Sequence, residues 1–213
     1  MANRRDNPTI AGAWALEEDV ESLRSYYGQW AASYDNDVAA ERYFAPKVAF
    51  DLLRAHLSES AFQSARLLDA GCGTGLVGEL LHQSGAAQID GFDLSEDMVA
   101  QAREKSVYDR LWQGIDLTQP IAPQIEATEY DVVMCVGVLT SGHVPPVGFT
   151  HLLEVVRTGG LIVMNAREQY VQQYAFEAFC ERLVAARQIR LHHCALAPSA
   201  GDSNALFLVA ERL

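Results

Sequence analysis

The chain has 213 residues, 49% of them hydrophobic, and a formal net charge of −12. This length and composition fit one globular α/β domain, and the acidity disfavours nucleic acid as a partner because such binding rests on neutralising phosphates. No apolar run approaches the ~20 residues of a membrane span, and the four cysteines form no C-x-x-C pair. We therefore expect a cytoplasmic protein with reduced thiols and with no metal or membrane partner; the sequence carries no signal for an oligomeric state.

The N-terminal part of the chain is predicted to carry two helices ahead of the core. Residues 1–18 are expected to be disordered. Over Val20–Tyr34 the apolar residues recur at steps of three and four, which predicts one helix with a single apolar face. A second helix is expected over Pro46–Leu57, where the proline suits the first turn. We expect residues 19–60 to form a helical lid on a core of residues 61–213.

Strands and helices then alternate along the chain. The strands are predicted over Ala65–Ala70, Gln88–Asp93, Leu111–Ile115, Tyr130–Val138, Leu161–Asn165, Ile189–Ala195 and Ala205–Ala210. The helices between them are predicted around Leu76–Leu81, after a cap at Ser95, over Pro145–Val156 with Gly159-Gly160 as its end, and around Tyr170, Tyr174 and Phe179. The last two strands are expected to form a hairpin around Pro198–Ser203. This alternation predicts a mostly parallel, doubly wound sheet that binds ligands at the carboxyl ends of its strands.

A glycine-rich loop follows the first predicted strand. The strand ends in Asp69, and glycine then occupies every second position at Gly71, Gly73 and Gly75. Bare backbone allows close approach of a ligand, and the start of the next helix favours a carboxylate or phosphate. Asp69 would repel a pyrophosphate and attract an ammonium group. A site that prefers a carboxylate at the helix start and an ammonium group beside Asp69 matches the amino-acid part of S-adenosylmethionine (SAM).

Two other nucleotide sites fit this loop less well. A dinucleotide fingerprint has the form G-x-G-x-x-G, but Leu76 stands where the third glycine would be. A P-loop requires Gly-Lys-Ser/Thr, which does not follow here.

A second acidic residue, Asp93, follows the second predicted strand. It comes 22 residues after Gly71, near the ~20 expected for an acid that binds ribose hydroxyls. Leu94 and Met98 are expected to pack on the adenine. The alternative is that Asp93 only opens the following helix.

These motifs resemble those of class I SAM-dependent methyltransferases, and the resemblance covers about Tyr26–Leu213. It is also carried by Tyr130–Leu139, Arg157–Leu161 and Trp30–Asp35. A narrower similarity, to the methyltransferase-like proteins of the Williams–Beuren syndrome region, is carried by Val136–Leu139, Gly142–Pro145 and Asn165–Arg167. The resemblance implies a Rossmann-like, seven-stranded sheet with helices on both faces, an antiparallel last strand, SAM as cofactor and S-adenosylhomocysteine (SAH) as product.

The resemblance also implies a set of cofactor-binding residues. Tyr34 reaches the cofactor, and Asp116 fills the place near adenine at the end of the third strand. Val136 and Val138 replace the polar pair usual after the fourth strand, so the acceptor side cannot be carried over. The cofactor-binding residues are then Tyr34, Asp69, Ala70, Gly71, Cys72, Gly73, Asp93, Leu94, Met98, Asp116 and Val136.

Methyl transfer from a sulfonium requires alignment, and a base only if the nucleophile arrives protonated. His143 follows the fourth strand and is the candidate base; alternatively it is a loop histidine that holds carbonyls. Arg167 ends the fifth strand and either pairs with an acidic acceptor or forms a surface salt bridge. Tyr27 and Trp30 are expected to pack in the core or to cover the ligand.

The predicted function is methyl transfer from SAM to a small-molecule acceptor by direct displacement. One alternative is a non-catalytic module that binds SAM or SAH, since the residues after the fourth strand supply no evident catalytic group. The other is a protein methyltransferase. The sequence does not identify the acceptor.

Overall fold

The computed structural model describes Gly12, residues 20–125 and residues 130–213. The expectation for residues 1–18 therefore falls, except for Gly12, outside the described part. The seven described strands form one sheet in the order β3-β2-β1-β4-β5-β7-β6. Their bounds are β1 Arg66–Ala70, β2 Gln88–Asp93, β3 Arg110–Gln113, β4 Tyr130–Leu139, β5 Val156–Arg167, β6 Ile189–Ala200 and β7 Ser203–Arg212. Strand β7 runs antiparallel to both of its neighbours, whereas the first five strands all run parallel to one another. This arrangement confirms the predicted α/β, Rossmann-like sheet.

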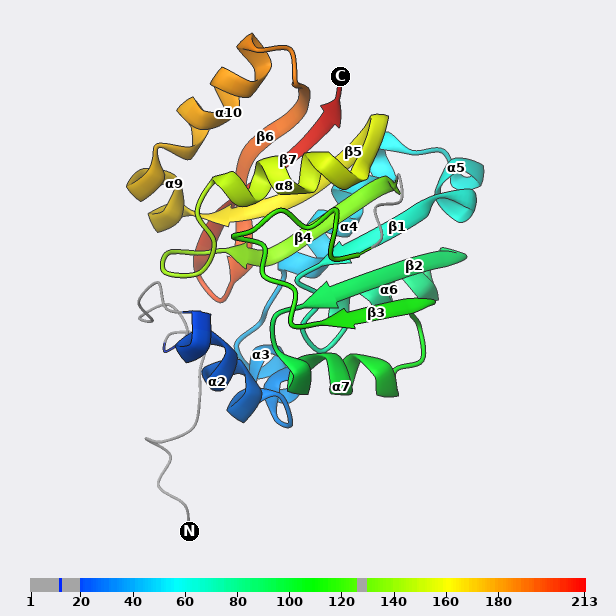
Figure 1. Cartoon of the computed structure of the whole chain (residues 1–213), viewed down its shortest axis with the longest axis vertical. Helices are drawn as coiled ribbons and strands as arrows, with labels where there is room; N and C mark the ends of the chain where they lie inside the picture. The colour runs from blue at the N-terminus through cyan, green and yellow to red at the C-terminus, as the bar shows by residue number, and fades with distance from the viewer. Residues whose placement is uncertain (1–11, 13–19, 126–129) are drawn as a thin grey trace.

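Helices cover both faces of the sheet. Alternate residues of each strand point to opposite sides, so each face has its own buried core. Helices α4 (Ala45–His56), α5 (Glu59–Ser64) and α6 (Leu76–Gln83) contribute to the core on one face. Helices α8 (Val147–Val155), α9 (Glu168–Tyr174) and α10 (Phe176–Ala185) contribute to the core on the other. Figure 1 shows α8 in front of the sheet and α4 and α6 behind it. Of the described helices, not one has the length and apolar character needed to cross a membrane.

The N-terminal segment differs from the single helix predicted through Tyr34. Helix α2 (Val20–Trp30) ends at Trp30, and α3 (Tyr34–Ala40) begins after a short turn. Asp37 holds this turn, because its Oδ2 accepts hydrogen bonds from Trp30 Nε1 at 2.9 Å and Ser33 Oγ at 2.7 Å. Figure 1 shows α2 and α3 beside α7 (Glu96–Glu104), at the arrowhead ends of β2 and β3.

Helix α4, which was expected to be part of the lid, packs against the sheet. It contacts α6 and strands β4 to β7, and Ala45, Ala49 and Leu53 are fully buried there. The predicted lid of residues 19–60 therefore has two parts: α2 and α3 lie at the end of the sheet, whereas α4 packs its apolar face on the sheet itself.

Three boundaries were predicted wrongly for local reasons. Gly159 and Gly160 lie inside β5 instead of ending α8, and β5 shifts its register against β4 next to Tyr130. The hairpin is tighter than predicted, because β6 and β7 extend into the predicted Pro198–Ser203 turn and the chain reverses at Gly201, whose φ is +53°. The helix predicted through Phe179 is split into α9 and α10 by Ala175, whose φ is +45°.

One local prediction about a helix start is confirmed. Ser95 precedes α7, and its Oγ accepts a hydrogen bond from the Met98 backbone N–H at 3.3 Å. This contact satisfies one of the free N–H groups of the first turn.

Candidate functional site

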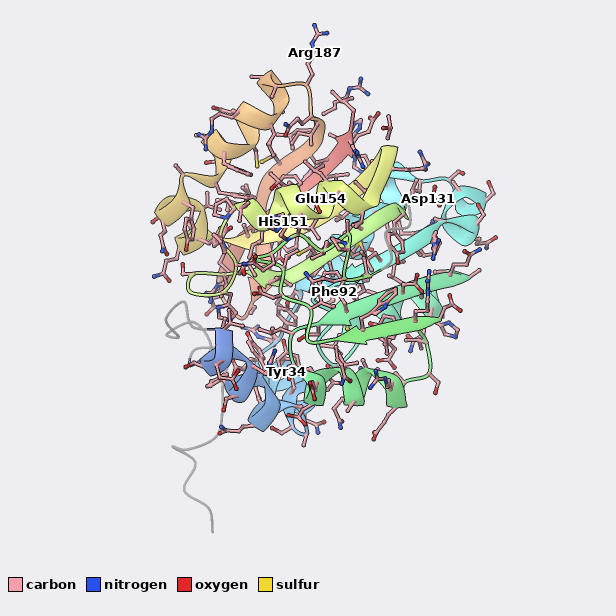
Figure 2. The ribbon with its side chains drawn as sticks, viewed as in Figure 1. Tyr34, Phe92, Asp131, His151, Glu154 and Arg187 are labelled. Carbon is pink, nitrogen blue, oxygen red and sulfur yellow. The ribbon has the colours of Figure 1, made fainter. Side chains whose placement is uncertain are left out.

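A cavity lies at the carboxyl ends of β1, β2 and β4, under helices α2 and α3. Figure 2 shows two of its walls, where Tyr34 comes from the N-terminal helices and Phe92 from the arrowhead end of β2. Ten of the twelve residues predicted for the site line this cavity: Tyr34, Gly71, Cys72, Gly73, Asp93, Leu94, Met98, Asp116, Val136 and His143. Asp69 and Ala70 do not line it.

The glycine loop is folded back onto β2. The backbone N–H groups of Gly71 and Cys72 both donate to the Phe92 carbonyl, at 2.9 and 2.8 Å. A Cβ on Gly71 would lie 2.3 Å from Val138 Cγ2, whereas a Cβ on Gly73 would meet no atom within 4 Å. Gly71 is therefore needed for packing, while Gly73 leaves open space on the cavity side.

The carboxylate of Asp93 forms part of the cavity wall. Its Oδ2 accepts from the Gly73 N–H at 2.9 Å and its Oδ1 accepts from the Ser95 N–H at 2.8 Å. Burial raises its pKa above the usual value. Each carboxylate oxygen can accept a second hydrogen bond. Asp93 thus precedes helix α7, as one interpretation held, and it also lines the cavity; ribose binding, the other interpretation, stays a prediction.

Asp69 lies behind the loop, where its carboxylate accepts hydrogen bonds from other groups of the protein. Only 1% of its surface is exposed. Its Oδ2 accepts from the Tyr108 hydroxyl at 2.7 Å and from the Gly78 N–H at 3.2 Å, and burial raises its pKa to about 7. In this structure the carboxylate therefore does not line the cavity where it was expected to face a ligand ammonium, and neither does Ala70, which was predicted to bind the cofactor.

Tyr108 is a residue that the sequence analysis missed. A Cβ on Gly78 would lie 2.2 Å from its hydroxyl oxygen, so a glycine in the middle of α6 makes room for the ring. A glycine at an otherwise good helical position was a signal of this contact in the sequence.

His143 forms a hydrogen-bonded pair with Tyr27. Its Nδ1 lies 3.2 Å from the Ser141 carbonyl oxygen, which can only accept, so Nδ1 carries the proton. Nε2 therefore accepts from the Tyr27 hydroxyl at 3.0 Å. Burial lowers the pKa of His143 to about 4 and raises that of Tyr27. The pair is neutral at physiological pH and joins α2 to the loop after β4.

Residues 67–160 match the family model described as "Methyltransferase domain". The chain is also 38% identical over 170 residues to Methyltransferase-like protein 27 of Homo sapiens, covering 78% of this chain and 67% of that protein. The chain belongs to the class I SAM-dependent methyltransferases. Its cofactor is SAM, as the resemblance implied.

Further relatives of this methyltransferase agree with the fold. A ubiquinone biosynthesis O-methyltransferase of Hydrogenovibrio crunogenus is 28% identical over 127 residues, which cover 58% of this chain and 52% of that protein. The structure of magnesium protoporphyrin IX methyltransferase from Synechocystis PCC 6803 with bound SAH superposes with a TM-score of 0.67 at 18% identity, covering 92% of this chain and 100% of that one. The methyltransferase therefore spans about half of the ubiquinone relative and the full length of the structural neighbour.

Helix α3 of the methyltransferase is joined to the glycine loop through Asp35. Asp35 accepts a hydrogen bond from Thr74 Oγ1 in the loop, and its Oδ2 pairs with Lys105 Nζ at 2.8 Å. Lys105 also pairs with Glu79 at 3.1 Å. Lys105 was not foreseen at this position, because its partners come from two other helices.

A smaller cavity adjoins the first. Tyr27, Tyr34, Tyr43 and Gly137 line both cavities. The remaining walls of the smaller cavity are Thr140, Asn165, Arg167, Ser199 and Ala200. Tyr43 lies in the turn between α3 and α4, outside any predicted motif, and was not foreseen as a site residue.

The described residues contain no cluster of three or more histidine, cysteine or acidic side chains that would suit a metal ion. In β6, His192 pairs with Glu211 at 2.8 Å.

Proposed function

We propose that this methyltransferase transfers the methyl group of SAM to a small-molecule acceptor. The observation that carries the proposal is the cavity beneath α2 and α3, which is lined by Gly73 and Asp93 as well as by Tyr27 and His143. A small molecule fits such a covered space better than a folded protein does. The names of two similar proteins point the same way, since one acts in ubiquinone biosynthesis and the other on magnesium protoporphyrin IX.

The chemistry of the walls suits SAM. Asp93 offers acceptors for the ribose hydroxyls, and Gly73 leaves the backbone open to the methionine part. Leu94 and Met98 supply an apolar surface for adenine, while Asp116 supplies a carboxylate near it. In this proposal Asp69 supports the loop from behind.

When bound, SAM supplies a methyl group on a positively charged sulfur, open to direct displacement. The protein's contribution is to align the acceptor atom with that methyl and to exclude water. An acceptor hydroxyl that replaces the Tyr27 hydroxyl would donate to His143 Nε2 in the same way. That nitrogen would then take the proton as the acceptor oxygen bonds to carbon.

The test combines binding with turnover. Calorimetry with SAM and SAH measures cofactor binding, and labelled SAM offered with a panel of metabolites measures transfer. A saturable methylated small molecule is the expected result. Labelled protein with no labelled small molecule would favour the protein methyltransferase instead, and SAM binding without any labelled product would favour the binding module.

A further inference from the structure

Tyr27 places a phenol group against the candidate base of the site. Its hydroxyl donates to His143 Nε2 at 3.0 Å, and its ring meets the imidazole edge-on, with the ring centres 5.7 Å apart and the planes at 74°. Both residues line the large cavity, which Gly73 and Asp93 also line. A phenol is thus already held beside His143 within the cavity that the cofactor would enter.

The Tyr27 side chain can turn aside while helix α2 stays in place. The helix is anchored at Trp30, which is 1% exposed and donates from Nε1 to Asp37 Oδ2, whereas Tyr27 is only half-buried. A change of rotamer is enough to move a half-buried side chain away from its partner. A ligand that takes the place of the Tyr27 ring then meets the same hydrogen-bond acceptor.

The walls next to this pair are apolar. Val144 follows His143 in the loop after β4 and also lines the cavity. Val20 and Leu23 precede Tyr27 by two turns and one turn on the same face of α2, and both line the cavity. Such walls favour a ligand that is itself apolar around the reacting atom.

The same cavity has little charge on its acceptor side. Of the described residues that line it, only Asp93 and Asp116 have charged side chains, and both belong to the proposed cofactor side. Arg167 lines the smaller cavity and not this one. Because a charge buried against apolar walls without a partner is costly, the large cavity favours an uncharged acceptor.

The weakness of His143 as a base distinguishes one kind of hydroxyl group from another. Burial and the neighbouring Arg167 lower the pKa of His143 to about 4. A phenol has a pKa of about 10, as tyrosine has, whereas an aliphatic hydroxyl is nearly as weak an acid as water, at about 15.7. Proton transfer to a weak base is faster from the more acidic group. A phenol therefore suits this base better than an aliphatic alcohol does.

We propose that the methyl acceptor is an uncharged phenol, which displaces the Tyr27 ring and donates its own hydroxyl hydrogen bond to His143 Nε2. The inference rests on the proposed function and names the substrate class. In the transfer, the phenol oxygen bonds to the methyl carbon, and the electron pair of the broken carbon–sulfur bond stays on sulfur. The phenol proton passes to Nε2, so the positive charge that leaves the sulfur appears on the imidazole. Tyr27 is thus a specificity-determining residue.

The first experiment compares phenols with isomeric alcohols. 4-Methylphenol is paired with benzyl alcohol and 4-ethylphenol with 2-phenylethanol, and each is offered to the wild-type protein with labelled SAM, beside the phenols of the metabolite panel. We expect kcat/KM to be at least about 100-fold higher for one or more phenols than for either alcohol. Preferred methylation of an alcohol, an amine or any other class without a phenol would overturn the inference and leave the proposed function standing.

The second experiment uses Tyr27→Phe, which keeps the ring and removes the competing hydroxyl. Because Nε2 is then free for the acceptor, KM for the phenol should fall about 3- to 10-fold, as expected for one hydrogen bond. Tyr174→Phe is the matched control, since Tyr174 ends α9 and lines neither cavity, and it should keep the wild-type KM. An unchanged or higher KM in Tyr27→Phe would also overturn the inference. SAM binding with no methylated small molecule of any class would instead count against the proposed function.

Discussion

The two halves of the large cavity are built in different ways. The half at β1 and β2 is built around a backbone loop, which is held by the bonds of Gly71 and Cys72 to Phe92 and of Gly73 to Asp93. The half at β4 is made of side chains that meet from distant parts of the chain, as Tyr27 and His143 do across 116 positions. The first half is a local structure that a short motif specifies, whereas the second exists only once the chain has folded.

The largest effect is expected at the β4 half, from His143→Gln. Loss of the imidazole should lower kcat by about 10²- to 10³-fold if Nε2 takes the acceptor proton, with SAM affinity unchanged. His82, which is exposed on α6, provides the control His82→Gln. Initial rates with the acceptor found in the metabolite panel measure the effect, and an unchanged kcat would leave His143 with only a structural role.

The same histidine gives a pH prediction. Its pKa is lowered to about 4 by burial, so Nε2 stays unprotonated as the pH falls through 6.5, the usual value for histidine. The contribution of His143 to kcat should persist to about pH 5 and be lost near pH 4. A rate that falls with a midpoint near 6.5 and depends on His143 would contradict the burial of this ring.

At the β2 half, Asp93→Ala should weaken SAM binding by about 100-fold. The variant removes both the ribose acceptors and the bond that holds Gly73, and charged hydrogen bonds are worth about 1.5–3 kcal/mol each. Calorimetry with SAM and SAH measures the change. The exposed Glu96, at the start of the same helix, gives the control Glu96→Gln; undiminished binding by Asp93→Ala would exclude the proposed ribose site.

Asp69 and Asp93 end adjacent strands, yet Asp69 should affect stability rather than binding. Burial raises the pKa of Asp69 from 3.8 to about 7, so between these values the folded protein holds a proton that the unfolded chain has released. The free energy of unfolding should therefore fall as the pH rises from 4 to 7, on the order of 1–4 kcal/mol. Urea unfolding at several pH values measures this: the free energy of unfolding should fall with pH in the wild type but not, through this group, in Asp69→Asn. Parallel pH profiles of the two proteins would show that Asp69 is ionised throughout this range.

The smallest effect is expected where helix α3 meets the glycine loop. Asp35→Asn weakens the pairing with Lys105, and partly exposed ion pairs contribute about 0.2–1 kcal/mol. SAM affinity should fall about two- to fivefold at low salt and less at high salt. The same calorimetry measures it, and Lys47→Met, which removes an exposed pair with Asp51 on α4, should cause no change. A loss as large as that of Asp93→Ala would mean that the lid itself forms the cofactor site.

The sequence by itself determined the α/β sheet, the cofactor and most of the loop that faces the cavity. Hydrophobic periodicity reports each strand and helix locally, and the spacing of Gly71, Gly73 and Asp93 is fixed by one β–α–β unit. The element boundaries near Gly159 and Ala175 were predicted wrongly, because the backbone has a positive φ at both residues. Local pattern does not reveal a register shift or a left-handed residue.

Only the tertiary structure decided which side chains share a cavity. It turned Asp69 toward Tyr108, placed α4 on the sheet, and brought Tyr27, Tyr43 and Arg167 around one space. The physical reason is that these contacts join residues far apart in the chain, whose meeting depends on strand order and helix packing. A motif of a few residues fixes how its own backbone bends, but the acceptor side depends on the whole sheet.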